Sequence, residues 1–315
     1  MNNLKKIGLT ALAGSLVATS VAYASELTAS GSASVTMENN SNSSAGKSIS
    51  MGNSVNFAGS GETDGGLNIS MKFELDQGAA DGTNGTFDSH SLSIGTDAMG
   101  TITVHGHGGS NAASALDTTA AGDLWDNTLI AKANKPQAAA SGNNIVVYKL
   151  PAVIDDVAIS ASYATDGEDD ASSTAWGLVY TGFEGLSFSY GQGNNNGTTN
   201  VDIDQRIMKA SYAIGSFTLG YSDNDYKHTT SSKDQGVKSM NISYTLSDQI
   251  SLSYGEETIE KTGTTVDIEV KGASASYTSG GMTLSVAQIV ADDVDHASTI
   301  HNDHEYWKLG LAFAF

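Results

Sequence analysis

Residues 27–37 read LTASGSASVTM, with apolar or small residues at the odd positions and only serine or threonine at the even ones. Residues 67–75 read LNISMKFEL, where the odd positions are large and apolar and the even ones polar. Successive side chains of a β-strand point to opposite faces of the sheet, so each segment would form a strand with one apolar face. One such strand suits a soluble sandwich as well as a membrane barrel. The number and spacing of the strands must therefore decide the fold.

The same alternation recurs through the rest of the chain and predicts sixteen strands. They are expected at 26–38, 47–59, 66–76, 85–96, 99–107, 143–150, 156–164, 173–182, 185–192, 203–214, 216–225, 236–246, 249–259, 264–278, 281–291 and 304–315. Tight connections, such as 97–98 and 215–216, alternate with longer acidic ones, such as 165–172 and 292–303. An even strand number with short turns and long loops is typical of outer-membrane barrels. We therefore predict an all-β fold, a transmembrane antiparallel β-barrel of sixteen strands.

In the strand expected at 264–278 the alternation slips. Its apolar residues at 266, 268 and 270 share one parity, whereas those at 273, 275 and 277 share the other. A β-bulge adds one residue to a strand and so exchanges its two faces. We therefore expect a bulge near Gly272.

Residues 1–24 have the features of a secretory signal peptide. Two lysines precede an apolar run at 7–22, and Ala22-Tyr23-Ala24 places small residues at the positions that signal peptidase reads. The run is interrupted by glycine, serine and threonine, and is too short and weak for a good spanning helix. We expect cleavage between Ala24 and Ser25, which leaves residues 25–315 as one barrel domain.

The composition excludes several classes of protein. The chain has 35 acidic against 15 basic residues and a formal net charge of −20, so it lacks the basic surface that nucleic-acid binding requires. It has no cysteine, which excludes disulfides and thiolate chemistry. After residue 25 there is no apolar run long enough for a membrane-spanning helix.

Eight tyrosines lie near the ends of expected strands and predict two aromatic girdles. Aromatic rings with a polar tip favour the membrane–water interface, and outer-membrane barrels carry such rings at both rims. The set near long loops is Tyr163, Tyr190, Tyr221 and Tyr254, and the set near short turns is Tyr180, Tyr212, Tyr244 and Tyr277.

The segment 304–315 reads HEYWKLGLAFAF and alternates up to a phenylalanine, with Trp307, Phe313 and Phe315 on one face. This ending resembles the C-terminal signal that the outer-membrane barrel assembly machinery reads. Together with the signal peptide and the strand count, it resembles the general porin family of Gram-negative bacteria, in particular its acidic, alphaproteobacterial type. The resemblance implies a homotrimer in contact with outer-membrane lipid. The small outward residues Ala29, Gly31 and Ala33 on the first strand suit close packing there.

In that family the third external loop folds into the lumen, where its acids face basic side chains on the wall. Here the longest connection, 108–142, follows the fifth expected strand, and the resemblance implies that its acids Asp117, Asp123 and Asp126 line the constriction. The alternation directs four lysines into the lumen, which makes them candidates for the wall: Lys72, Lys149, Lys209 and Lys308. Lys72 and Lys308 lie on strands three and sixteen and should be near each other once the barrel closes. The single arginine, Arg206, points outward near a rim.

An acidic loop beside a weakly basic wall favours cations, because acidic side chains attract cations and repel anions. We therefore expect a general diffusion porin that passes small hydrophilic solutes and ions across the outer membrane. Two alternatives stay open. A substrate-specific channel of similar strand number would carry an aromatic track along the lumen, where aromatics are scarce. A secreted or surface-attached structural or adhesive protein would be soluble without detergent and have its apolar core between two sheets.

Other polar motifs predict no catalytic or metal site. The stretch HGHGG at 105–109 loosely resembles an esterase oxyanion segment, but no Gly-x-Ser-x-Gly elbow supplies a nucleophile, so we expect no enzyme. The histidines at 296, 301 and 304 lie among aspartates with a spacing that matches no defined metal site. The acids at 166–170 lack the EF-hand pattern and suit weak surface Ca²⁺ at most, so no cofactor is expected.

Overall fold

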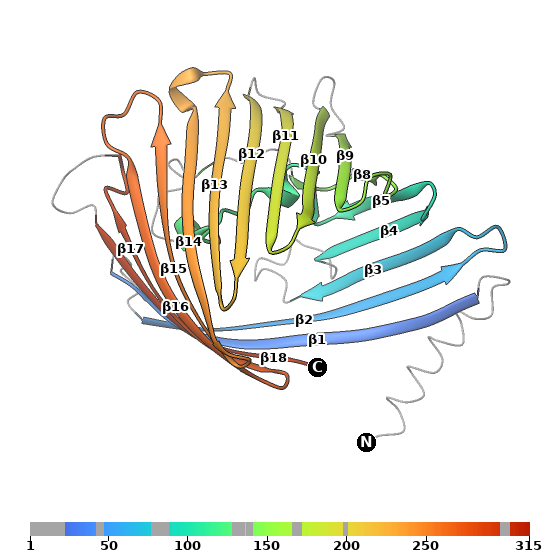
Figure 1. The fold of residues 1–315 in the computed structure, drawn as a ribbon, viewed down its shortest axis with the longest axis horizontal. Helices are drawn as coiled ribbons and strands as arrows, with labels where there is room; N and C mark the ends of the chain where they lie inside the picture. The colour runs from blue at the N-terminus through green and yellow to red at the C-terminus, as the bar shows by residue number, and fades with distance from the viewer. Residues whose placement is uncertain are drawn as a thin grey trace.

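The computed structural model describes residues 23–41, 47–76, 88–127, 136, 141–165, 172–197, 201–296 and 303–315. In these residues sixteen strands form one closed barrel, in which each strand pairs antiparallel with its neighbours (Figure 1). The predicted fold class is confirmed. The barrel strands are β1 (Tyr23–Asn40), β2 (Lys47–Glu62), β3 (Asn68–Asp76), β4 (Ser89–Thr96), β5 (Gly100–His107), β8 (Ile145–Lys149), β9 (Val157–Thr165), β10 (Ser172–Phe183), β11 (Leu186–Gly197), β12 (Val201–Ile214), β13 (Phe217–His228), β14 (Gln235–Ser247), β15 (Ile250–Lys261), β16 (Ile268–Ser279), β17 (Met282–Asp292) and β18 (His304–Ala314).

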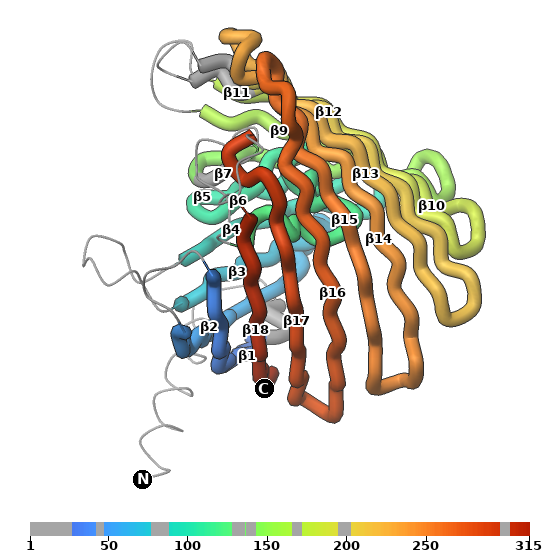
Figure 2. The backbone as a smooth tube through the Cα atoms, turned by 90° about the vertical axis from the view of Figure 1, so that its left-hand side faces the viewer, coloured from blue at the N-terminus to red at the C-terminus, as the bar shows by residue number. Residues whose placement is uncertain are grey.

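The barrel closes where the first strand pairs with the last, and Figure 2 shows β1 beside β18. At the end of this seam Gly31 N donates to Phe315 O (2.7 Å) and Phe315 N donates to Gly31 O (3.0 Å). The Phe315 ring lies over Gly31, where an added Cβ would stand 2.5 Å from ring atom Cε2. The last residue of the chain therefore pairs with a glycine that leaves room for its ring.

The two faces of the barrel wall differ in composition. One face, which we call the belt face, exposes large apolar side chains such as Ile49, Leu252 and Val286. The other, which we call the polar face, carries cross-strand pairs of hydroxyls: Ser32 with Ser54, Ser93 with Thr103, Ser251 with Ser276, and Ser253 with Ser274. A single closed sheet with an exposed apolar belt differs from a sandwich, whose core lies between two sheets. No helix in the described part of the chain is long and apolar enough to cross a membrane.

The bulge expected near Gly272 is absent from the described strand β16, and that prediction was wrong. Gly272 pairs in unbroken register with Gly255 of β15 and with Ile289 of β17. Ile268 and Val270 lie on the polar face, yet both are fully buried in an apolar cluster. The apolar residues of β16 change parity because, at the end of β16 that holds Ile268 and Val270, the apolar cluster covers the face that is polar elsewhere.

The long connection between β5 and β8 contains short elements of its own. β6 (Gly109–Ser110) pairs with β7 (Ser141–Gly142) as a separate two-stranded sheet. Among the described residues of the connection, η1 (Ser114–Leu116) and η2 (Leu124–Asp126) are short 3₁₀ helices, and a similar one, η4 (Ser231–Lys233), joins β13 to β14. We call residues 111–127 the docked segment.

Candidate functional site

The docked segment runs along the polar face from β9 to β16 and is held there by wall hydroxyls. Its backbone N–H groups donate to serine Oγ atoms, each at 2.9 Å: Ala112 to Ser162 on β9, Ala120 to Ser222 on β13, and Ala121 to Ser239 on β14. An irregular segment leaves many backbone donors without partners, and buried donors of this kind are costly unless paired. The alternating serines of the strands therefore serve as its acceptors.

Wall glycines allow the docked segment to lie close to the strands. A Cβ added to Gly255 would stand 2.5 Å from the Cβ of Ala121, and one added to Gly177 would stand 2.7 Å from the carbonyl oxygen of Ala112. Side chains at these positions would push the segment away from the wall. Glycine in these strands thus reflects close approach of a second backbone.

Glu257 anchors the turn of the docked segment, and sequence reasoning missed it. This β15 residue is 1% exposed, and its carboxylate accepts hydrogen bonds from Thr119 Oγ1 and from Trp125 N, the latter at 3.0 Å. Thr119 N also donates to Asp123 Oδ1 (2.9 Å), and Asp123 N donates to Thr119 Oγ1 (2.8 Å). The one available signal was an acid that follows Ser251, Ser253 and Gly255 at the same parity of β15.

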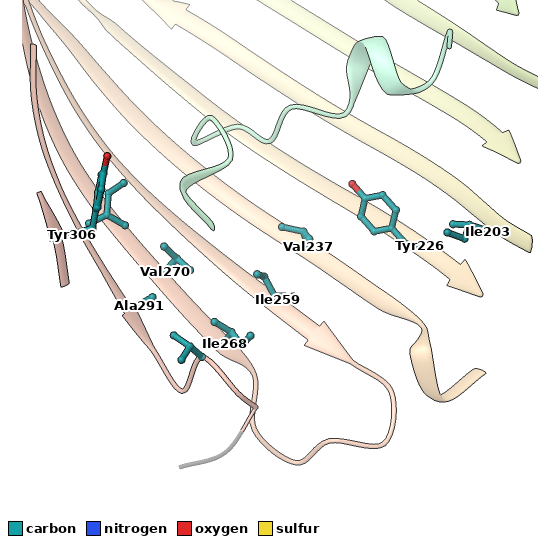
Figure 3. Close-up of a cluster of buried hydrophobic side chains, with 10 residues drawn as sticks. Ile203, Tyr226, Val237, Ile259, Ile268, Val270, Ala291 and Tyr306 are labelled. Atoms are coloured by element: carbon teal, nitrogen blue, oxygen red, sulfur yellow. The ribbon is translucent and has the colours of Figure 1, made fainter. Parts of the chain in front are cut away.

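Apolar contacts hold the far end of the docked segment. Leu124 and Trp125 pack against a buried cluster that extends from β12 to β18 and includes Ile259 and Val270 (Figure 3). The labelled side chains come from several neighbouring strands, two of them from β16, and lie on one side of the sheet. The segment is therefore fixed by hydrogen bonds along its length and by apolar burial at its end.

Asp117, predicted for the constriction, lies half-buried on the docked segment. Gln205 Nε2 donates to its Oδ2 (3.2 Å), and Asn224 Nδ2 donates to its carbonyl oxygen (2.6 Å). Burial raises the pKa of the Asp117 carboxyl to about 6, the hydrogen bond from Gln205 opposes this rise, and the charge of Asp123 adds to it. Asp117 therefore changes charge within the mildly acidic range.

The three predicted loop acids lie on the same segment, and one predicted lysine lies beside them. Asp123 is half-buried in the turn that Glu257 anchors, whereas Asp126 is exposed at the end of η2. Lys209 on β12 donates from Nζ to the carbonyl oxygen of Thr118 (2.7 Å). Lys209 is thus the predicted wall lysine that the structure brings to the acidic segment.

The other three predicted lysines lie apart from this site. Lys149 is exposed on β8 opposite Ser160 and Thr101. Lys72 pairs with Ala58, which pairs with Thr28, whereas Lys308 pairs with Glu38 of the same strand β1.

The expected proximity of Lys72 and Lys308 is contradicted. Their partners on β1, Thr28 and Glu38, are about 33 Å apart along the strand at a rise of ~3.3 Å per residue. Closing a sheet into a barrel staggers the strands, so neighbours in strand order can differ widely in height.

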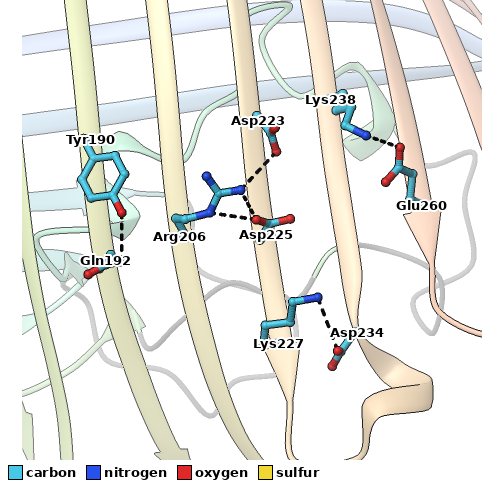
Figure 4. Close-up of polar contacts among 9 residues, drawn as sticks. All are labelled: Tyr190, Gln192, Arg206, Asp223, Asp225, Lys227, Asp234, Lys238 and Glu260. Carbon is cyan, nitrogen blue, oxygen red and sulfur yellow. Dashed lines mark hydrogen bonds and ion pairs between the residues drawn. The ribbon is translucent and has the colours of Figure 1, made fainter.

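The predicted aromatic residues lie mainly on the belt face. Tyr163, Tyr180, Tyr212, Tyr221, Tyr254 and Tyr277 are exposed, while Tyr190 and Tyr244 are half-buried. On β18, Trp307 is half-buried and Phe313 is exposed, as is Phe315 beyond the strand. The outward rim arginine, Arg206, forms ion pairs with Asp225 and Asp223 on the neighbouring strand (Figure 4).

Some polar motifs fall outside the described residues. These are the acids at 166–170 and His301. Within the described ranges, no three histidine, aspartate or glutamate side chains cluster closely enough to hold a metal ion.

Comparison with known proteins identifies the family. A family model of Gram-negative porins matches residues 8–315. The fold is similar to an anion-selective porin from Comamonas acidovorans, with a TM-score of 0.72 and 15% identity over 92% of this chain and 99% of that one. It is also similar to a triple mutant of Rhodopseudomonas blastica porin (TM-score 0.67, 15% identity, 92% and 100% covered). A third similar fold is OmpT, an outer membrane protein of Vibrio cholerae (TM-score 0.68, 14% identity, 92% and 97% covered).

No curated protein sequence matches the chain significantly. Structural similarity at such low identity reports the fold alone, whereas the family model covers almost the whole sequence. The chain belongs to the Gram-negative porin family, and it is a protein of the outer membrane.

Proposed function

We propose that this porin is a general diffusion channel, which lets small hydrophilic solutes and ions cross the outer membrane passively. The polar face of the wall lines the channel, and the docked segment narrows it. The observation that carries this proposal is the continuous attachment of that segment to the polar face from Ser162 to Glu257. A segment fixed in this way sets the diameter and charge of the passage.

General diffusion is favoured over a substrate-specific channel by the distribution of aromatic rings. A track for one solute requires exposed rings along the polar face. At the described strand positions of that face, Tyr226 and Tyr306 are both 5% exposed and belong to the apolar cluster. They are covered and offer no surface to a passing solute.

We propose that the channel prefers cations. The docked segment carries Asp117, Asp123 and Asp126, and among the described residues only Lys209 of the predicted wall lysines reaches it. Acidic side chains at a constriction raise the local concentration of cations. The fold does not decide the sign of selectivity, because a similar fold belongs to an anion-selective porin.

Planar-bilayer recordings across a salt gradient test both parts of this function. Purified protein should insert in discrete conductance steps, and its zero-current potential should have the sign of cation preference. The variant Asp123→Asn/Asp126→Asn should move that potential toward zero. An absence of conductance steps contradicts the channel, whereas a potential that favours chloride contradicts the charge preference alone.

The remaining expectations concern processing and assembly. We propose that residues 1–24 are removed on export and that the barrel assembly machinery recognises the C-terminal strand with Trp307, Phe313 and Phe315. The mature chain would form a homotrimer surrounded by outer-membrane lipid. Channel activity without catalysis accords with the family, whose members are pores.

A further inference from the structure

On β10 to β12 the belt face changes from apolar to polar between two successive rows of cross-strand partners. Leu178, Tyr190 and Met208 stand side by side in register and form the last apolar row. The next row toward the long connections consists of Trp176, Gln192, Arg206 and Asp225, in which polar and charged side chains follow a single aromatic ring. Since these residues lie on the belt face, this row marks the height at which the barrel wall passes from the hydrocarbon core of the membrane into the headgroup region.

A groove of about 550 Å³ lies on the belt face at this level. Its lining includes Ala175 and Gly193, whose Cβ positions face the docked segment on the other side of the wall, so that they contribute backbone to the groove. Thr174 and Asn194 form the row above, and Thr174 Oγ1 donates to Asn194 Oδ1 (2.9 Å). The groove thus faces outward from the barrel and is separate from the channel site on the polar face.

One wall of the groove is an exposed aromatic platform with amide groups beside it. Trp176 is 41% exposed, and its ring is tilted against that of Tyr190 with the centroids 5.5 Å apart. Gln192 Nε2 donates to the Tyr190 hydroxyl (2.9 Å), which orients both side chains. A flat ring beside amide and hydroxyl groups suits a ligand with an apolar face and hydroxyl-bearing edges.

Both cationic side chains of the groove are already paired with aspartates within the protein. Arg206 Nε donates to Asp225 Oδ2 (2.8 Å), and Lys227 lies 3.5 Å from an oxygen of Asp234 (Figure 4). Asp204 adds a further carboxylate to the lining. A multiply charged anion would have to displace these aspartates, so the groove favours a neutral, hydroxylated ligand.

We propose that this groove binds the saccharide headgroup of a glycolipid in the outer leaflet. The acyl chains of such a lipid lie along the belt below Leu178 and Tyr190, which brings its sugars to the level of the groove. Trp176 stacks against a sugar ring, and the amides of Gln192 and Asn194 bind its hydroxyls. The lipid would be a specific ligand of the wall, in addition to the lipid that solvates the belt.

Tryptophan fluorescence can test this proposal, because the chain has three tryptophans and only Trp176 lies in the groove. The variant Trp125→Phe/Trp307→Phe reports from Trp176 alone. Its matched control, Trp125→Phe/Trp176→Phe, reports from Trp307 on the belt face of β18. Both are reconstituted in phosphatidylethanolamine vesicles that contain either a neutral diglycosyl diacylglycerol or, at the same mole fraction, phosphatidylcholine.

We expect the neutral glycolipid to lower acrylamide quenching of Trp176 severalfold relative to phosphatidylcholine, and to leave Trp307 unchanged. Adding Gln192→Ala/Asn194→Ala to the Trp176 reporter should abolish the protection while conductance steps persist. Equal protection of Trp176 in both membranes would mean that the ring is an interfacial anchor only, and would overturn the proposal. Equal protection by the de-acylated saccharide would overturn the lipid as ligand.

Discussion

At the scale of single residues, Phe315 and Gly31 show how the barrel closes. Phe315 is 76% exposed, yet its backbone exchanges two hydrogen bonds with Gly31 and its ring covers the position where a Cβ would be. The space at Gly31 is thus needed within the chain itself. Its small size alone does not indicate a trimer contact.

The substitution Gly31→Val should displace the Phe315 ring and lower the stability of the barrel by about 1 kcal/mol. Because the ring is terminal and can turn aside, the strands should stay paired. The midpoint of the heat-induced shift in gel mobility measures the effect.

Two comparisons separate a ring contact from a general intolerance of valine in the strand. Gly31→Val should cost much less in a Phe315→Ala background, because contacting residues are not additive. Gly59→Val is the matched control, since a Cβ there meets only Leu27 at 3.9 Å. Equal losses in all three cases would contradict the assigned role of the Phe315 ring.

The acidity of Asp117 predicts a pH-dependent selectivity. Burial raises the pKa of this carboxyl to about 6, so it is charged above that pH and neutral below it. Cation preference should therefore weaken as the pH falls through about 6. Zero-current potentials on either side of this pH measure the change.

The variant Asp117→Asn is the control for that titration. It should resemble the acidic form at every pH and remove the step near pH 6. A step of the same size in the variant would assign the titration to another group.

At the scale of elements, the docked segment depends on Glu257. The variant Glu257→Ala removes the acceptor for Thr119 and Trp125, and each buried hydrogen bond lost costs roughly 1–3 kcal/mol. The barrel should still form, because the strand ladders are untouched. Single-channel recordings should show larger current fluctuations and a changed conductance.

A disulfide offers an independent attachment for the same segment. A Cβ on Gly220 would lie 3.2 Å from the Cβ of Ala120, near the ~3.8 Å typical of disulfides, and the chain has no native cysteine to mispair. In a Glu257→Ala background, oxidised Ala120→Cys/Gly220→Cys should restore quiet currents, and reduction should reverse this. Quiet currents in Glu257→Ala alone would show that Glu257 does not position the segment.

The start of β1 bears on the predicted signal peptide. Tyr23 and Ala24 pair with Glu62 and Gly61, but a register irregularity separates them from the pairs that begin at Glu26. Cleavage after Ala24 should therefore remove only these two pairs and leave the barrel intact. The intact mass of protein isolated from outer membranes should correspond to residues 25–315, and a full-length mass would refute the cleavage.

At the scale of the whole molecule, alternation was enough to predict the strands and the two faces of the wall. It reports which face a residue occupies, but not its height relative to distant strands, which the stagger of the barrel sets. The expected meeting of Lys72 and Lys308 failed for this reason. The false bulge at Gly272 arose because apolar residues were assigned to one face only.

The candidate site was predictable in part. The long connection and its acids stand out in the sequence, and Lys209 was nominated by parity. Glu257 was missed because its partner Thr119 lies 138 residues away, and no local pattern links the two. Hydrogen bonds between distant segments depend on the folded barrel, so sequence periodicity does not reveal them.

The attachment of the docked segment through its backbone has a consequence for how such pores diversify. The wall serines at 162, 222 and 239 bind amide groups, which every residue except proline possesses. Mutations that change the side chains of the segment can therefore accumulate without detaching it. A lineage could reverse its ionic preference by a few substitutions while inheriting the same scaffold.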